Sequence, residues 1–499
     1  MNIMTAIDGY KLDHRRQYPP GTQKVYSNWT PRSSRTGESA VVFFGLQYLI
    51  AHYLEDEMRR NFFEQPKAHA VNEYKRRLLS YVGDDAAGAI GTDHIAALHD
   101  LQYLPLKICA LPEGSIGRIG LPMLTIENTH DDFFWLVNYF ETLISSILWM
   151  PCTSATTAAR YRGYLDMIAK KTGTDPDAVQ WQAHDFSFRG MPGLEAAQLS
   201  GAGHLLSFRG TDSIPAIDFL EKYYGPIGHQ IGGSVPATEH SVMCAGGKDG
   251  ELETISRLLD LYPTGVLSIV SDTWDLWNVV DNILPKLKDK ILARNGKLVI
   301  RPDSGDPVEI ICGITNPKHR LHITDSRGIV ERLWRTFGGS MTDDKGYAVL
   351  NPHIGVIYGD SITYERCEKI CKGLMKQGFA PANVVFGIGS YTYQYVTRDT
   401  YGFAMKATWV KIDGKGYNIF KKPATDTKRE KTSATGRLAV LPSQYNSAPY
   451  NARLVEDATY EEENKSLLKP VWTGRDGFHI MHDLTSIRNR LHPNWKLEQ

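Results

Sequence analysis

Between about residues 180 and 391, short runs of β-branched and apolar residues alternate with longer amphipathic stretches. The runs "VLSIVSD" (266–272), "KLVIRPD" (297–303), "IGVIYGD" (354–360) and "NVVFGIG" (383–389) have the length of strands. Stretches such as "SITYERCEKICKGLMKQG" lie between them and have helical periodicity. Continuous apolar strands separated by helices predict a parallel sheet buried on both faces. The predicted fold class is α/β, with an irregular parallel α/β barrel over residues 179–391.

The two ends of the chain have a different pattern. Short strand-like segments such as "KVYSNW" and "PMLTIEN" are mixed with helical ones, including "FFWLVNYFETLISSILWM". After residue 391, "FAMKATWVKIDGKGYNIF" alternates apolar and polar residues around Asp413-Gly414, which is typical of a β-hairpin. We expect residues 1–178 and 392–499 to form one discontinuous α+β domain, with the barrel inserted in it.

Acidic residues follow three of the predicted barrel strands. These strands run into Asp272, Asp303 and Asp360, and the fourth ends in a glycine-rich segment. Because the carboxyl ends of parallel strands meet at one mouth of a barrel, we expect these side chains to converge on a ligand site. Arg301, just before Asp303, adds a cation. The alternative is that each aspartate only caps the helix that follows it.

Composition narrows the function classes. The chain has 499 residues, of which 42% are hydrophobic, with 56 basic and 56 acidic residues. A net charge of zero argues against broad capture of nucleic acid or of an acidic membrane. Asp8 and Lys11 interrupt the N-terminal apolar residues, so no secretory pattern is expected, and no apolar run approaches the ~20 residues of a membrane span. The six cysteines form no CxxC pair, which favours reduced thiols and a cytoplasmic location.

Three short motifs carry candidate binding chemistry. In "HDFSFRG" (184–190), Phe186 and Phe188 would share one face of a strand beside Arg189, an arrangement that suits a flat heteroaromatic ligand; the alternative is that both rings belong to the core. In "FRGTDS", Asp212 is a candidate ligand residue or a helix N-cap. In "SVPATEHSVM", His240 is a candidate catalytic group or a surface histidine, and the lack of an HExxH motif argues against a histidine metal site.

Basic residues gather near the C-terminal hairpin. Arg398 and Lys406 are followed by "KKPATDTKREK" (421–431), which is either a solvated loop or a segment that grips phosphate. No GxxxxGK[ST] loop appears, and no GxGxxG segment joins a strand to a helix, so P-loop and Rossmann sites are not predicted. Carboxylates, arginines, a glycine-ended strand and aromatic rings together suit a phosphorylated sugar, a divalent ion and a planar base.

These motifs, in this order, resemble the nicotinamide phosphoribosyltransferase family, a group of type II phosphoribosyltransferases related to nicotinate phosphoribosyltransferase. The resemblance covers nearly the whole chain and rests on "DGYKLDHRRQYPPGTQKVYSNW", "FFGLQYLI", "HDFSFRG", "GTDS", "SVPATEHS", "SIVSDTWD", "RPDSGDP", "YGDSI", "FGIGS" and "TRD". It implies an α+β domain with an irregular α/β barrel. It also implies synthesis of nicotinamide mononucleotide and pyrophosphate from nicotinamide and phosphoribosyl pyrophosphate in NAD salvage, with Mg²⁺ as cofactor.

The resemblance further implies a role for each matching residue. Phe186 would stack on nicotinamide, with Tyr10 from the second subunit of a homodimer on the other face, Arg189 near the amide oxygen and Asp212 accepting from the amide NH₂. His240 would be phosphorylated by ATP, which stimulates the reaction, and is grouped with Asp303 and Asp272 as catalytic. The implied ribose and phosphate ligands are Arg301, Asp303, Gly359, Asp360, Gly389, Arg32, Arg398, Lys406, Lys421 and Lys428; no residue is assigned directly to a metal.

Asp212 bears on the choice between two substrates. A carboxylate there can accept a hydrogen bond from a carboxamide, whereas nicotinate would bring a second negative charge against it. Nicotinamide is therefore the expected substrate, and nicotinate phosphoribosyl transfer is the alternative. Ser390 and Ala404 depart from the residues common in the family at these positions, which affects the expected phosphate contacts. Neither nucleic acid nor a membrane is an expected partner.

Overall fold

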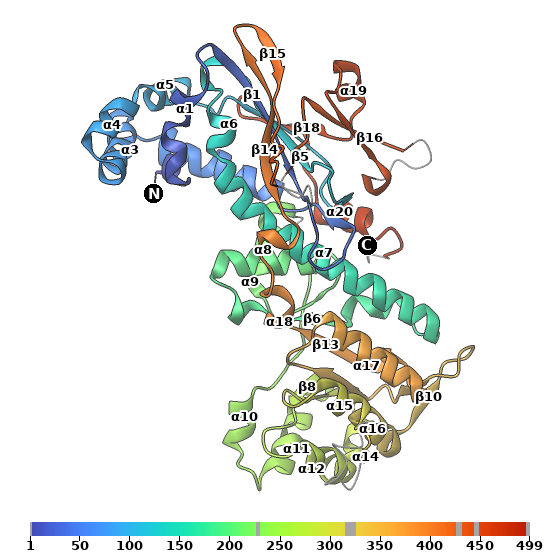
Figure 1. Cartoon of the computed structure of the whole chain (residues 1–499). Helices are drawn as coiled ribbons and strands as arrows, with labels where there is room; N and C mark the ends of the chain where they lie inside the picture. The colour runs from blue at the N-terminus through green and yellow to red at the C-terminus, as the bar shows by residue number, and fades with distance from the viewer. Residues whose placement is uncertain (1, 226–229, 315–325, 426–431, 444–448, 496–499) are drawn as a thin grey trace. The chain divides into compact units, whose positions relative to one another are not determined.

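The computed structural model (Figure 1) describes residues 2–225, 230–314, 326–425, 432–443 and 449–495. The chain forms two compact units. The first unit comprises residues 1–156, 220–227 and 396–494, and the second comprises 157–219, 228–395 and 495–499. The predicted domain division at residues 178/179 and 391/392 stays a prediction, because a compact unit need not be a domain that folds independently.

The first unit is built on a seven-stranded antiparallel sheet in the order β15-β14-β1-β5-β3-β18-β19. The predicted hairpin is present: β14 and β15 are joined by Asp413 and Gly414, both at positive φ, as such a turn requires. The strands are β1 (Thr22–Thr30), β3 (Leu106–Ala110), β5 (Leu124–Asn128), β14 (Ala404–Ile412), β15 (Lys415–Asn418), β18 (Lys469–Thr473) and β19 (Gly477–Phe478). Two smaller sheets pair β2 (Ala40–Val42) with β4 (Ile116–Arg118) and β16 (Leu438–Leu441) with β17 (Arg453–Glu456).

The first unit also contains α-helices, joined by loops and short 3₁₀ or π-helical segments. The longest helix, α7 (Glu141–Thr172), begins in this unit and carries Glu141 at its first position. The others are α1 (His14–Gln17), α2 (Leu46–Tyr48), α3 (Lys67–Val82), α4 (Asp84–Ile90), α5 (Asp93–Leu101), α6 (Leu136–Tyr139), α19 (Tyr460–Lys465) and α20 (Leu484–Leu491). Among the described residues no single helix meets the length and hydropathy of a membrane span; only the bent pair 131–139 and 141–172, at 43°, does so when taken together.

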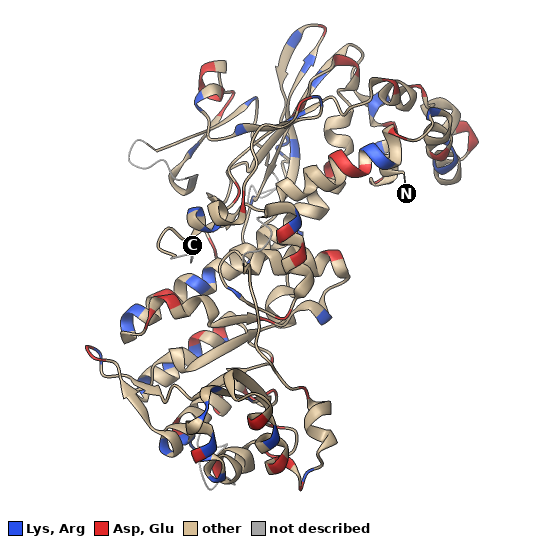
Figure 2. Cartoon of the chain, turned by 180° about the vertical axis from the view of Figure 1, so that it is seen from behind, with Lys and Arg blue, Asp and Glu red and all other residues tan. Residues whose placement is uncertain are grey.

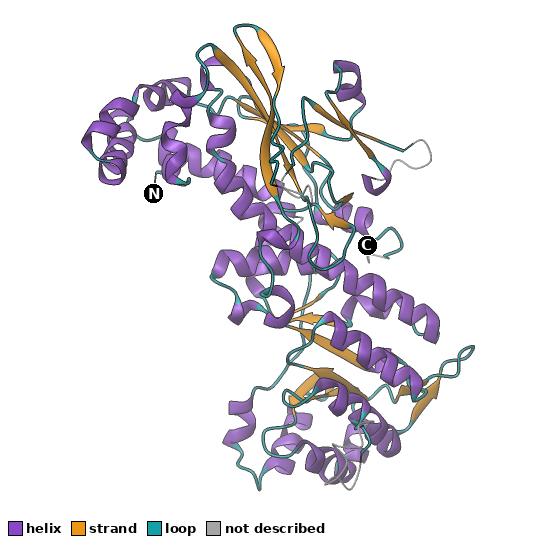
Figure 3. Cartoon of the chain, viewed as in Figure 1, coloured by secondary structure: helices purple, strands orange, loops and turns teal. Residues whose placement is uncertain are grey.

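The second unit contains a six-stranded parallel sheet in the order β7-β6-β13-β12-β9-β8. β12 is buried along its whole length, as the continuous apolar pattern predicts. Figure 3 shows helices flanking these strands. The strands are β6 (Ala183–Asp185), β7 (Gly210–Thr211), β8 (Thr264–Val270), β9 (Asn295–Arg301), β12 (Ile354–Tyr358) and β13 (Val384–Ile388).

The helices of this unit follow the strands in alternation. They are α8 (Leu194–His204), α9 (Ile214–Tyr224), α10 (His240–Ala245), α11 (Glu251–Leu261), α12 (Leu276–Asn278), α13 (Leu284–Lys286), α14 (Lys288–Ala293), α15 (Pro307–Cys312), α16 (Ile329–Phe337), α17 (Tyr364–Lys376) and α18 (Ser390–Tyr393). A two-stranded ribbon, β10 (Gly339–Met341) and β11 (Ala348–Leu350), follows α16. The apolar faces of the helices pack against the strands in one buried core, to which the strands contribute Ile269, Ile300, Val356 and Phe386.

One irregular segment links the two edge strands of the parallel sheet. Gly233 makes a parallel bridge to Gly210 on β7, and Ala237 makes one to Ser268 on β8. In the first bridge, Thr211 N–H donates to Gly233 O and Gly233 N–H donates to Arg209 O; in the second, Ser268 N–H donates to Pro236 O and Thr238 N–H donates to Ser268 O. The sheet is therefore curled into an irregular barrel, and the predicted α/β fold class is confirmed.

One local prediction was wrong. The alternation in "HDFSFRG" suggested a strand through Phe188, but β6 ends at Asp185 and residues Phe188–Gly190 form a 3₁₀ turn. The Asp185 carboxylate explains the early end, because it accepts the backbone N–H of Ser187 and so favours a turn. Figure 2 shows acidic and basic residues interspersed on the helices of both units, in agreement with the zero net charge.

Candidate active site

The carboxyl ends of the parallel strands lie in register. Val270 on β8 pairs with Arg301 on β9, and Tyr358 on β12 pairs with Phe386 on β13. Asp272, Asp303 and Asp360 each lie two residues beyond the last residue of their strands, which are β8, β9 and β12. The topology therefore brings these carboxylates to one edge, although they are far apart in sequence.

The loop after β9 is held by both neighbouring strands. The Asp272 carboxylate accepts the backbone N–H of Asp303 at 2.8 Å and the hydroxyl of Ser304 at 2.6 Å. From the other side, the Tyr358 hydroxyl donates to the carbonyl oxygens of Ser304 and Gly305, both at 2.9 Å. Burial, reinforced by nearby carboxylates, raises the pKa of Tyr358, so its hydroxyl remains a donor. The loop is thus fixed by groups that lie outside it.

Helix capping is performed by other aspartates. Asp275 caps α12 and Asp306 caps α15, each through backbone N–H groups of the first turn. Asp272 instead holds the β9 loop, and Asp303 and Asp360 line a cavity of about 390 Å³. The alternative that strand-end aspartates only cap helices therefore holds for Asp275 and Asp306, and not for the predicted residues.

Most of the predicted residues of the second unit share that cavity. Its lining also contains Phe188, which was considered with Phe186, and Ser390, which was expected near phosphate. Asp185, Ser361 and Tyr391 line it as well and were not predicted as site residues. Ser361 adopts φ of +53°, an unusual backbone conformation for serine next to Asp360. The predicted residues that line the cavity are Phe186, Arg189, Asp212, Arg301, Asp303, Gly359, Asp360 and Gly389.

Two glycines make room for functional side chains. A Cβ at Gly359 would lie 2.3 Å from Oδ1 of Asp303, and one at Gly387 would lie 2.8 Å from the ring of Phe186. The N–H of Gly359 donates to the Pro302 carbonyl, so this glycine contributes space rather than a free backbone donor. The positions of Asp303 and Phe186 thus depend on the absence of side chains at Gly359 and Gly387.

The aromatic end of the cavity combines a ring, a cation and a carboxylate. The Arg301 guanidinium lies 6.0 Å from the centroid of the Phe186 ring. Oδ1 of Asp212 accepts hydrogen bonds from His184 Nε2 at 2.8 Å and from the Ser234 hydroxyl at 2.7 Å. Burial by itself would raise the pKa of Asp212, but the hydrogen bonds and the nearby positive charge lower it overall. The Asp212 carboxylate is therefore available as an acceptor.

His240 lies at the same rim but does not line the cavity. It is the first residue of α10, and its Nε2 is 3.6 Å from Oδ2 of Asp303. Its Nδ1 is 3.4 Å from the Thr273 hydroxyl, and about half of its side chain is exposed. An exposed imidazole beside a cavity carboxylate is accessible to a second ligand.

Some polar atoms at this edge have no protein partner. Among the described residues, Arg301 Nε, Asp185 Oδ2 and Asp272 Oδ1 are buried without a hydrogen bond. Because an unsatisfied buried polar atom is costly, such a group at a cavity indicates a ligand or ordered water. Within the described part of the chain, no three His, Cys, Asp or Glu side chains form a group that could hold a metal ion by themselves.

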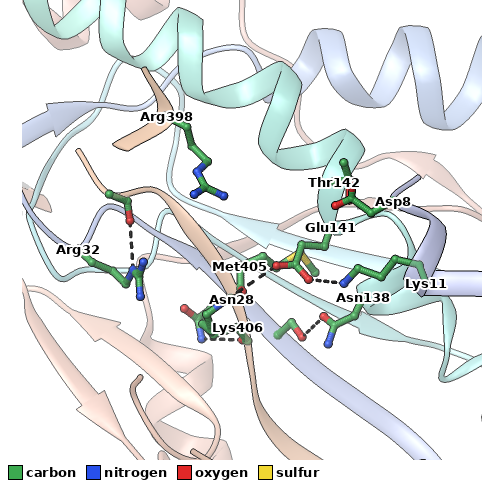
Figure 4. A network of polar contacts seen from close by, with 12 residues as sticks. Asp8, Lys11, Asn28, Arg32, Asn138, Glu141, Thr142, Arg398, Met405 and Lys406 are labelled. Atoms are coloured by element: carbon green, nitrogen blue, oxygen red, sulfur yellow. Dashed lines mark hydrogen bonds and ion pairs between the residues drawn. The ribbon is translucent and has the colours of Figure 1, made fainter. Parts of the chain in front are cut away.

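The other predicted phosphate ligands belong to the first unit. Figure 4 shows Lys11 extending toward Glu141, and Glu141 Oε1 also lies 3.9 Å from Lys406 Nζ. Burial lowers the pKa of Lys406; Glu141 opposes this, whereas the positive charges of Arg32, Lys421 and Lys11 add to it. Several cations around one carboxylate can accommodate an additional anion.

Three further predictions concern this part of the chain. Tyr10 is 61% exposed, with Lys11 Nζ 5.1 Å from its ring centroid. Arg398 is half exposed and contacts the carboxylate of Asp399. Lys428 lies outside the described residues. The roles proposed for these side chains stay predictions.

Comparison with known proteins finds family matches over most of the chain. Residues 181–470 match the model of the "Nicotinate phosphoribosyltransferase (NAPRTase) family", and residues 2–108 match "Nicotinamide phosphoribosyltransferase, N-terminal domain". A nicotinamide phosphoribosyltransferase from Acinetobacter baylyi is 49% identical over 98% of this chain and 97% of its own length. A nicotinamide phosphoribosyltransferase from Mycoplasma pneumoniae is 37% identical over 86% of this chain and 93% of its own length.

Solved structures agree at the level of the fold. Nicotinate-nucleotide pyrophosphorylase from Pyrococcus furiosus superposes with a TM-score of 0.58 at 15% identity, covering 100% of this chain and 97% of the other. Human nicotinic acid phosphoribosyltransferase superposes with a TM-score of 0.52 at 15% identity, covering 99% of this chain and 93% of the other. The family match over most of the chain and the relative at 49% identity, together with the fold, identify this chain as a phosphoribosyltransferase that belongs to the nicotinate phosphoribosyltransferase family.

Proposed function

We propose that this protein transfers the phosphoribosyl group of phosphoribosyl pyrophosphate to nicotinamide, forming nicotinamide mononucleotide and pyrophosphate in NAD salvage. The observation that carries the proposal is the convergence of Phe186, Asp212 and Asp303 on one cavity that also holds arginines. The similarity to proteins named nicotinamide phosphoribosyltransferase over nearly the whole chain supports it independently.

Nicotinamide would bind at the aromatic end of the cavity. Its ring would lie against Phe186, with Arg189 near the amide oxygen and Asp212 accepting from the amide NH₂. The hydrogen bonds that lower the pKa of Asp212 keep it an acceptor at neutral pH. Nicotinate would bring a like charge against this carboxylate, which is unfavourable in a partly dry site.

The ribose and phosphate would occupy the edge formed by the β9 and β12 loops. Arg301, Asp303 and Asp360 line this region, and Gly359 and Gly389 leave space beside them. The pyridine nitrogen attacks C1 of the ribose while the bond from C1 to pyrophosphate breaks, and the nitrogen becomes a pyridinium. No proton is transferred, so the protein needs no general base. It contributes position and charge stabilisation.

Mg²⁺ is the proposed cofactor. The cavity carboxylates Asp303 and Asp360 have the oxygen donors that Mg²⁺ prefers, and an ion that arrives with substrate phosphates needs only one or two protein ligands. The lack of a complete protein cage among the described residues is compatible with this mode of binding. When bound, the ion supplies positive charge to the leaving pyrophosphate.

ATP is the proposed stimulating co-substrate. The His240 imidazole would attack the terminal phosphorus of ATP and release ADP. The added negative charge would then act beside Asp303 on the pyrophosphate-bearing state. Exposure of the imidazole and its 3.6 Å separation from Asp303 support this assignment.

The homodimer is also part of the proposal. Tyr10, Arg32, Arg398, Lys406, Lys421 and Lys428 would complete the site, with Tyr10, Arg398 and Lys406 coming from the second subunit. The charge cluster around Lys406 supports an anion-binding role. A cytoplasmic location is proposed from the cysteine pattern alone.

The direct test is a comparison of substrates. Purified protein should form nicotinamide mononucleotide from nicotinamide and phosphoribosyl pyrophosphate with Mg²⁺, at a higher kcat/KM than the corresponding reaction with nicotinate. Efficient use of nicotinate with little nicotinamide turnover would replace the proposal by nicotinate phosphoribosyl transfer. Lack of turnover with both would reject both assignments.

A further inference from the structure

A histidine lies behind the aromatic end of the cavity and contacts two of its lining residues. His184 is 9% exposed and is absent from the cavity lining. Its Nε2 lies 2.8 Å from Oδ1 of Asp212, and its ring centroid lies 4.7 Å from that of Phe186 at an interplanar angle of 39°. One buried side chain thus touches both the aromatic ring and the carboxylate proposed to bind nicotinamide.

The strand register fixes this contact. His184 on β6 pairs with Gly210 on β7, and the backbone N–H of Asp212 donates to the Asp185 carbonyl at 3.0 Å. A Cβ at Gly210 would lie 2.8 Å from His184 Nδ1, so the glycine provides the space in which the imidazole lies. Adjacent parallel strands therefore set the position of the ring relative to Asp212.

The direction of the hydrogen bond follows from chemistry. An ionised carboxylate only accepts, so His184 Nε2 carries the hydrogen and donates to Asp212. The Ser234 hydroxyl donates to the same oxygen, Oδ1. Both protein contacts thus fall on one oxygen, while 45% of the Asp212 side chain remains exposed. The second oxygen, Oδ2, is left for a donor on the ligand.

We propose that His184 is a positioning residue that determines amide specificity, by holding Asp212 so that Oδ2 accepts from a carboxamide N–H donor while its ring supports Phe186. This inference rests on the proposed transfer to nicotinamide and assigns a role to a residue outside the cavity. Without the donor at Nε2, the Asp212 carboxylate can rotate. The Phe186 ring and the Asp212 carboxylate then no longer keep a fixed position relative to each other. Because rigid placement of binding groups accounts for much of their contribution to substrate binding, nicotinamide should bind less well.

The test compares nicotinamide and nicotinate as substrates of three variants at position 184. His184→Leu removes the donor, His184→Gln keeps an amide N–H at a similar reach, and His184→Asn keeps the amide but is one methylene too short. His184→Leu and His184→Asn should raise KM for nicotinamide and lower the nicotinamide-to-nicotinate ratio of kcat/KM by about 10- to 100-fold. His184→Gln should restore most of the ratio, and KM for phosphoribosyl pyrophosphate should change little.

A double-mutant comparison separates positioning from a general loss of structure. In an Asp212→Ser background, His184→Asn should produce no further fall in the ratio, because the effect of His184 on amide preference acts through Asp212, whereas its contact with Phe186 concerns both substrates alike. His353 is a matched control: its Nδ1 lies 3.0 Å from the Gly296 carbonyl and it does not line the cavity, so His353→Leu should leave the ratio unchanged. Melting temperatures report folding of every variant.

The inference is overturned if folded His184→Asn or His184→Leu retains the wild-type ratio. It is also overturned if the ratio falls equally in the Asp212→Ser background, or if His184→Gln restores nothing. Failure of the wild-type protein to use nicotinamide would reject the proposed function instead, so the two failures are distinct.

Discussion

The carboxylate of Asp272 accepts the backbone N–H of Asp303 at 2.8 Å, which links the ends of two neighbouring parallel strands. The same oxygen accepts the hydroxyl of Ser304. Asp272 therefore acts on the cavity through Asp303, which lines it, and not by lining it directly.

Replacing Asp272 by alanine should release the loop that carries Asp303. We expect kcat/KM for phosphoribosyl pyrophosphate to fall by about tenfold or more, because two hydrogen bonds to a charged group are lost. Steady-state kinetics measure this effect. Asp306→Ala in the same loop is the control: it removes the α15 cap and costs about 1 kcal/mol of stability, but should largely preserve transfer. Equal kinetic losses in both variants would contradict the role of Asp272.

Replacing Gly359 by alanine should displace Asp303. The added Cβ would lie 2.3 Å from Oδ1 of Asp303, and misplacement of a substrate-binding group lowers kcat/KM by about 10- to 100-fold. Gly389→Ala is the steric comparison, because a Cβ there meets nothing within 4 Å. Kinetics should show the larger loss for Gly359→Ala, and the reverse order would refute the steric explanation.

Asp212→Ser should narrow the preference for nicotinamide over nicotinate. The substitution removes the negative charge that repels nicotinate and weakens the acceptor for the amide, so the ratio of kcat/KM values should fall by about tenfold or more. Competition between the two substrates in one reaction measures the ratio directly. An unchanged ratio would mean that another residue selects the amide.

His240→Ala should abolish stimulation by ATP while part of the ATP-independent transfer remains. The exposed imidazole, 3.6 Å from Asp303, is the proposed phosphoryl acceptor. Transfer with and without ATP, and incorporation of labelled phosphate into protein, provide the measurements. Stimulation that persists in the variant would assign the phosphoryl group to another residue.

Glu113 should make stability depend on pH. Burial, only partly offset by hydrogen bonds from the Gln47 and Gly45 backbone N–H groups, raises the pKa of Glu113 from 4.5 to about 7. Because the folded-state pKa is the higher one, this contribution to stability is complete below about pH 4.5 and is lost as pH rises to about 7. The loss is on the order of 3 kcal/mol.

Chemical unfolding at pH 5 and pH 8 tests this expectation. The free energy of unfolding of wild type should fall more between these values than that of Glu113→Gln, which stays neutral throughout. Identical pH dependence of the two proteins would show that folding does not raise the pKa of Glu113.

Part of the site could be predicted from the sequence because its signals are local. An apolar run that ends in Asp303 or Asp360 marks a buried strand followed by a polar mouth, and parallel topology then implies convergence. The hairpin at Asp413-Gly414 was predictable for the same reason, since the turn residues themselves carry the conformational requirement.

Other features were decided only by tertiary structure. The contact between His184 and Asp212 depends on the register of β6 and β7, and no local pattern in "HDFSFRG" distinguishes a supporting histidine from a core one. The same holds for Tyr358, whose hydroxyl reaches the loop after β9 from a neighbouring strand. Phe188 lies outside β6, contrary to the prediction, because the Asp185 carboxylate accepts the backbone N–H of Ser187 and so favours a turn over continued strand pairing.

The sequence by itself thus determined the α/β class, through apolar periodicity, and the acidic strand ends, through strand-end polarity. The family and the other predicted residues around the cavity followed from the resemblance of its short motifs. Tertiary structure decided which side chains hold those residues in place. Such supporting contacts join segments distant in sequence, and their geometry exists only once strand register and loop packing bring the partners together.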